Sequence, residues 1–160
     1  MLVSALSTAN SRGTTVTAST ATANTKGAYT QLLASSTRDA YGIYVHITSE
    51  DATTADLLCD IGVGASSDTQ VAIENLLFTK TTTQDLSSQF YIPLYIPSGT
   101  RISARIQAST TTTIVTAEFS IYLDQIGILP SMVSQRVFTM GAATSDSGGV
   151  LVDATPLNTK

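Results

Sequence analysis

The side chains best suited to catalysis are scarce in this sequence. His46 is the only histidine and Cys59 is the only cysteine. A Ser-His-Asp triad would need His46 as its general base, yet no Gly-x-Ser-x-Gly nucleophile elbow occurs. One histidine cannot build a metal centre that uses several, and Gly62-x-Gly64 lacks the third glycine and the following helix of a nucleotide loop. The sequence therefore predicts no catalytic residue, no metal site and no cofactor, and we expect the protein not to be an enzyme.

Two further groups of reactive residues have simpler interpretations. Cys59 lies in an apolar strand-like run, where we expect a buried small side chain, and a single cysteine forms no internal disulfide. Four carboxylates are close in sequence but do not have the spacing of an EF-hand loop: Glu50, Asp51, Asp56 and Asp60. We interpret them as solvated loop charge, with a calcium site between two loops as the alternative.

The tyrosines suggest a contact surface. If the apolar register of the strands is correct, four tyrosines point away from the core, and His46 shares a face with Tyr44. Exposed aromatic side chains on a face of low charge are typical of interfaces. The candidate oligomer or partner interface is Tyr44, His46, Tyr91, Tyr95 and Tyr122. A homo-oligomer, most simply a homotrimer, is the preferred hypothesis, and a sugar-binding platform would have the same features.

Alternation of apolar and polar residues indicates the elements that position these side chains. A period of two predicts strands at 40–48, 57–64, 89–96, 101–109 and 115–123, and weaker strands fit 28–35 and 69–78. No helix is predicted. Short strands at this spacing favour an all-β, jelly-roll-like β-sandwich. The segment Ile96-Pro97-Ser98-Gly99 has the residues of a type I turn, which predicts a hairpin between the strands on either side.

The two ends of the chain differ from the middle. Residues 1–25 are rich in Ser, Thr, Ala and Asn and predict an extended N-terminal arm, in which 13–18 could form an edge strand. Residues 26–125 form the predicted β-sandwich domain. Residues 126–160 break the alternation and predict a C-terminal extension that could return a strand to the sandwich.

Composition limits the classes of partner. Of the 160 residues, 27 are Thr and 19 are Ser, only 12% are charged, and the net charge is −4. Binding to a nucleic acid backbone normally requires a basic patch, so we expect no nucleic-acid partner. No apolar run approaches the ~20 residues of a membrane-spanning helix, and the N-terminus lacks the features of a signal peptide. We therefore expect no membrane partner and synthesis in the cytoplasm.

One part of the chain resembles a known group of proteins. Residues 60–65, 71–76 and 92–109, and above all the Ile-Pro-x-Gly-Thr-Arg-Ile-x-Ala-Arg segment from Ile96 to Arg105, are similar to small β-sandwich virion proteins of tailed bacteriophages. The resemblance implies a virion structural protein made in the host cytoplasm. The first expectation is a capsid decoration (cement) protein on the capsid surface, which binds the major capsid protein and itself, stabilises the head and takes no small molecule. The alternative is a tail, baseplate or fibre-associated structural protein, or a receptor- or carbohydrate-binding protein.

Overall fold

The chain folds into two facing β-sheets. The computed structural model describes residues 2–3, 13–49, 55–80, 86–110, 115–124 and 137–138. Its strands are β1 (Leu2–Val3), β2 (Thr14–Thr17), β3 (Thr30–Leu33), β4 (Gly42–Ser49), β5 (Ala55–Val63), β6 (Gln70–Lys80), β7 (Leu86–Ile92), β8 (Ile102–Ala108), β9 (Thr116–Asp124) and β10 (Val137–Phe138). These residues contain no helix that is long and apolar enough to cross a membrane.

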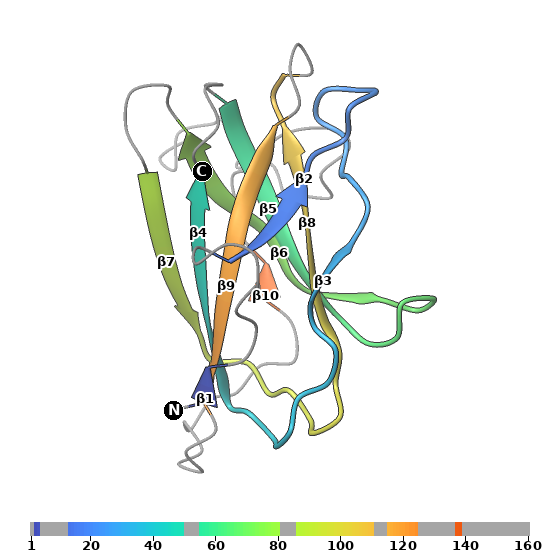
Figure 1. Cartoon of the computed structure of the whole chain (residues 1–160), viewed down its shortest axis with the longest axis vertical. Coiled ribbons are helices and arrows are strands. Elements are labelled where there is room, and N and C mark those ends of the chain that lie inside the picture. Colours follow the sequence, from blue (N-terminus) through green and yellow to red (C-terminus); the bar gives the residue numbers. More distant parts are fainter. Residues whose placement is uncertain are drawn as a thin grey trace, which may run out of the picture.

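The first sheet has the order β1-β9-β4-β7, with β2 also paired to β9, and the second has the order β10-β6-β5-β8-β3. Pairing is antiparallel except between β10 and β6, which run parallel. In Figure 1 the strands β7, β4 and β9 lie side by side, with β5, β6 and β8 behind them. We call the β9-β4-β7 side the tyrosine sheet and the β6-β5-β8 side the back sheet.

The core lies between the sheets and follows the predicted alternation. Ile43, Val45 and Ile47 of β4 are fully buried, and so are Cys59 and Ile61 of β5. The predicted all-β, jelly-roll-like β-sandwich is therefore confirmed. Residues 14–17 of the predicted N-terminal arm form β2, and the side chain of its Val16 is buried in the core. Residues 4–12, and those from 125 onward other than 137–138, lie outside the described residues.

The hairpin predicted around Pro97 is wrong. The strand before this turn, β7, pairs with β4 in the tyrosine sheet, whereas the strand after it, β8, pairs with β5 and β3 in the back sheet. The turn therefore carries the chain from one sheet to the other. It also begins one residue later than predicted, because Thr100 N–H donates to Pro97 O at 3.3 Å. Gly99 has a φ of 83°, a conformation that glycine adopts without steric cost.

A β-bulge interrupts β6. The pairing of β5 with β6 changes register between Cys59 and Ile61, and Asn75 on the facing stretch has a φ of 58°. Ile73 and Leu76 of β6 are both buried in the core, although they are three positions apart instead of two. The bulge therefore turns Asn75 toward the outer side of the back sheet.

Candidate functional site

The outer face of the tyrosine sheet carries three rows of side chains. Strand pairing places Tyr44 of β4 between Tyr91 of β7 and Tyr122 of β9. Two residues further along β4, His46 lies between Gln89 and Ser120. Successive rows on one face of a sheet are about 7 Å apart and neighbouring strands are about 4.8 Å apart. An aromatic row and a polar row therefore run side by side across three strands.

A third row ends this face. Thr48 lies between Ser87 of β7 and Glu118 of β9, and its hydroxyl donates to Glu118 Oε2 at 3.4 Å. The carboxylate of Glu118 therefore lies at the end of the face that is farthest from the row of tyrosines. The middle row carries the amide of Gln89, the imidazole of His46 and the hydroxyl of Ser120, which donate and accept hydrogen bonds.

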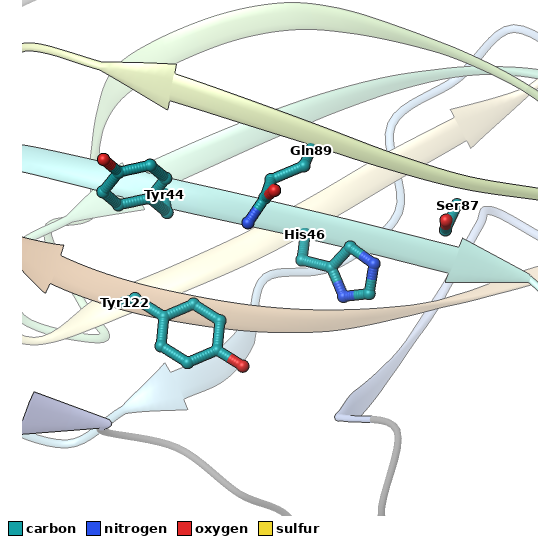
Figure 2. A pocket seen from close by; sticks show the side chains of 5 residues that line it. All are labelled: Tyr44, His46, Ser87, Gln89 and Tyr122. Carbon is teal, nitrogen blue, oxygen red and sulfur yellow. The ribbon is translucent and has the colours of Figure 1, made fainter.

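A hollow of about 490 Å³ lies over these rows and opens to solvent. It is lined by Tyr44, His46, Ser87, Gln89 and Tyr122. Figure 2 shows the five side chains on one side of the sheet, with Gln89 extending from β7 between Tyr44 and His46. The volume is in the range of pockets that hold small organic ligands. Tyr44 is 37% exposed and Gln89 is also exposed, so a ligand could reach both from solvent.

Contact between two rings fixes the aromatic row. The ring centroids of Tyr44 and Tyr91 are 4.5 Å apart and the rings are tilted by 43°. Tyr91 lies over Gly42 so closely that a Cβ at Gly42 would lie 2.6 Å from the Tyr91 hydroxyl oxygen and 2.7 Å from Cε2 of its ring. Glycine at position 42 is therefore what allows the Tyr91 ring to lie across β4.

The hydroxyl of Tyr91 extends the row toward a carboxylate. It donates to Asp124 Oδ2 at 3.4 Å. Partial desolvation and, after it, the charge of Asp124 raise the pKa of Tyr91, so the phenol remains a neutral hydrogen-bonding group at physiological pH. Tyr91 is 44% exposed, which leaves part of its ring open to solvent.

The structure brings four of the five predicted interface residues together. Tyr44, His46 and Tyr122 line the hollow, and Tyr91 contacts Tyr44 beside it. Tyr95 lies apart from them, in the connection after β7, where its ring packs on Tyr41 at a centroid distance of 5.7 Å. The role of these residues as an oligomer or partner interface stays a prediction.

Two residues that line the hollow, Ser87 and Gln89 of β7, were not among the predicted interface residues. Ser87 and Gln89 precede Tyr91 at intervals of two, so the alternation that directed Tyr91 outward would have directed them outward as well. Ser87 lies before the predicted strand 89–96, and a glutamine such as Gln89 is common on any exposed strand. Only the pairing of β7 with β4 gives them a shared site.

Other chemistry is not supported by the described residues. Among them, no group of three or more His, Cys, Asp or Glu side chains is arranged to hold a metal ion. Burial raises the pKa of the Cys59 thiol to about 12, which makes it a poor nucleophile. Asp60 is fully buried, so its interpretation as solvated loop charge is wrong, while Glu50 and Asp51 lie outside the described residues.

Comparison with known proteins gives one distant structural match. No family model and no curated protein matches the chain. The CBM22-1 xylan-binding domain of Xyn10C from Paenibacillus barcinonensis is similar with a TM-score of 0.39 and 16% sequence identity. The match covers 54% of this chain and 58% of that domain, so it spans less than two thirds of either. It is too distant to carry an argument about ligands.

Proposed function

We propose that the protein is a non-catalytic binding module whose tyrosine sheet binds a neutral carbohydrate. The observation that carries this proposal is a row of three tyrosines beside a polar row, with two of these tyrosines lining a solvent-accessible hollow. Tyrosine rings offer flat apolar surfaces, and a sugar ring has one apolar face and a rim of hydroxyl groups. The arrangement provides for both parts of such a ligand.

The polar groups of the hollow match hydroxyl ligands better than charged ones. Gln89 supplies an amide with two donors and an acceptor, and His46 supplies ring nitrogens. None of the described residues that line the hollow is a lysine, an arginine or a carboxylate. An ionic ligand would lack a partner of opposite charge there, so a neutral oligosaccharide is the ligand class that the site favours.

An array of short neutral and anionic oligosaccharides tests the proposal. We expect binding to a subset of the neutral glycans, and loss of that binding in Tyr44→Ala and Gln89→Ala. The matched control is Tyr95→Ala, because Tyr95 packs on Tyr41 away from the hollow. Binding that survives Tyr44→Ala, or that requires anionic glycans, would contradict the proposed site.

A second candidate function rests on the sequence resemblance of residues 92–109 to phage virion proteins. In this case the protein is a structural component of the virion, either a capsid decoration protein that binds the major capsid protein or a component of the tail or fibre. Bound copies would stabilise the assembled shell by mass action. Capsids that lack the protein would then lose integrity at lower temperature, whereas its recovery only in purified tails would exclude the decoration role.

The two candidates differ in what covers the tyrosine sheet. A self-associating decoration protein buries Tyr44 and Tyr91 against another copy, and its mass in solution is then that of an oligomer, most simply a trimer. A carbohydrate-binding component of a tail or fibre leaves the same rings open to solvent. Glycan binding by a monomer at micromolar concentration would favour the first proposal.

A further inference from the structure

A lysine, an aspartate and an asparagine meet on the outer side of the back sheet. Lys26 Nζ donates to Asp60 Oδ1 at 2.7 Å, to Asn75 Oδ1 at 2.9 Å and to Leu58 O at 3.1 Å. The amide carbon of Asn75 is one carbonyl bond from its Oδ1, so it lies within about 4 Å of the lysine nitrogen. A nucleophilic amine thus contacts both a carboxylate and a carboxamide.

Backbone geometry holds these groups in place. The bulge at Asn75 turns its N–H toward Asp60 Oδ1, to which it donates at 2.9 Å. The other oxygen of Asp60 accepts from Arg105 Nε at 2.8 Å. The backbone next to Lys26 is attached to β8, because Gly27 N–H donates to Ile106 O at 2.9 Å. The three reacting groups therefore come from separate parts of the chain, and each is oriented by its own contacts.

The cluster is closed to water. The side chain of Asp60 is 1% exposed and that of Lys26 is 7% exposed. Asn75 is also buried, and the ring of Tyr29 covers Arg105, whose guanidinium carbon lies 4.7 Å from the ring centroid. Burial lowers the pKa of Lys26, although the charge of Asp60 opposes this effect. Neutral amine, the form that can attack a carbonyl carbon, is therefore easier to reach here than at a surface lysine.

We propose that Lys26 and Asn75 react in the folded chain to form an intramolecular isopeptide bond, with Asp60 transferring the protons. This inference goes beyond the proposed carbohydrate site and does not depend on it. The class of modification is a side-chain amide crosslink, which would join the segment before β3 to the bulge of β6 across the back sheet.

The reaction balances without any other reagent. Lys26 gives one proton to Asp60, and the freed electron pair of Nζ attacks Cγ of Asn75 to form the Nζ–Cγ bond. Asp60 relays a second proton from Nζ to Nδ2 of Asn75. The Cγ–Nδ2 bond then breaks, and ammonia leaves with the bonding electron pair and takes the remaining proton from Asp60. A lysine ammonium and a carboxamide thus become a secondary amide and an ammonium ion, and Asp60 returns to its carboxylate form.

Electrostatics favour the product. Before the reaction, Lys26 and Arg105 both form ion pairs with Asp60, so that among the described contacts two cations share one carboxylate. A buried cation without a full counter-charge is unfavourable in the protein interior. The crosslink removes the lysine charge as an ammonium ion that can leave to solvent. One buried carboxylate and one guanidinium then remain as a matched pair.

Intact mass spectrometry of the purified wild-type chain tests the proposal. We expect a mass about 17 Da below that of the sequence, which is the loss of one ammonia. Trypsin cleaves after Arg12, Arg38 and Lys80 but not at an acylated lysine, so the crosslink would yield one branched peptide of residues 13–38 and 39–80. A succinimide would also lose ammonia, but Lys26 would then be cleaved, giving separate peptides of residues 13–26, 27–38 and 39–80. A wild-type chain of full sequence mass, or unlinked peptides, would overturn the proposal.

Two variants assign the chemistry. Lys26→Arg keeps the cation but removes the nucleophilic amine, and Asp60→Asn keeps the shape but removes the proton carrier. Both are expected to have the full mass of their sequences. Lys80→Arg is the matched control, because it changes another lysine that is not in the cluster, and it should retain the loss of ammonia. The crosslink persisting in Lys26→Arg would show that a different lysine reacts, contrary to the proposal.

Discussion

Removal of the central ring from the tyrosine sheet should weaken carbohydrate binding by a predictable amount. Tyr44 is 37% exposed, which for a tyrosine side chain of about 200 Å² leaves about 75 Å² of surface for a ligand to cover. At ~25 cal/mol per Å² this area corresponds to about 2 kcal/mol. Tyr44→Ala should therefore raise the dissociation constant of the best neutral glycan by about 30-fold.

Isothermal titration calorimetry with the best array ligand measures this effect. Two controls accompany it: Tyr95→Ala removes a tyrosine that packs on Tyr41 away from the hollow, and Leu77→Ala removes a side chain on β6 that is 60% exposed. Both should bind within about twofold of the wild type, because small surface changes outside the site cost little. A dissociation constant unchanged in Tyr44→Ala would refute the role given to the aromatic row, and so would an equal loss in Tyr95→Ala.

Three further changes have defined outcomes. Gly42→Ala should displace the Tyr91 ring and lower glycan affinity about fivefold. The melting temperature should change little, because the new Cβ meets a side chain and not the backbone. Calorimetry and thermal unfolding would show whether binding and stability separate in this way. Asp60→Ala should lower the free energy of unfolding by about 3–5 kcal/mol, since it leaves a buried cation without its carboxylate. If denaturant unfolding shows a loss below about 1 kcal/mol, the cluster is not a stabilising element. As the pH rises from 9 toward 12, the Cys59 thiol ionises only in the unfolded chain, because its pKa in the folded chain is raised from 9.0 to about 12. The free energy of unfolding of the wild type should therefore fall by about 1.4 kcal/mol per pH unit more than that of Cys59→Ala. Parallel curves of stability against pH for the two proteins would contradict this prediction.

The sequence located most strands well because each of them has a face on the core, whereas β7 (Leu86–Ile92) begins three residues and ends four residues before the predicted strand 89–96. Alternation is a local property of a strand, so it located β4 (Gly42–Ser49) and β9 (Thr116–Asp124) to within one or two residues. The same alternation directed Tyr44 and Tyr122 outward from these strands. The sequence could not show that β7 pairs with β4, and it is this pairing that brings Gln89 beside His46.

Two features lay beyond a pattern of period two. At the turn after Pro97 the chain changes sheets, and local turn residues contain no information about which strand pairs with which. At Asn75 the bulge adds a residue and reverses which side of β6 faces the core. The contact of Asn75 with Lys26 joins residues 49 positions apart, so only the folded structure reveals it.

The back sheet is more buried than the alternation of its residues predicted. Polar residues of β8 that alternate with the core positions were expected to face water or a partner. Ser103 and Gln107 face away from the core, yet they are 0% and 2% exposed. In the same region, backbone hydrogen bonds attach Asn24 and Gly27 to β8. Segments without strong periodicity can thus cover a sheet face that its own sequence marks as polar.

The most direct test of the proposed function locates the ligand on the protein. Two-dimensional NMR spectra of the wild-type chain, recorded while the best neutral oligosaccharide from the array is added, report which residues the ligand contacts. The proposal predicts that the largest shifts occur at Tyr44, His46, Gln89 and Tyr122, with the surroundings of Tyr95 unchanged. Shifts centred elsewhere, or no shift with any neutral glycan at millimolar concentration, would contradict carbohydrate binding by the tyrosine sheet.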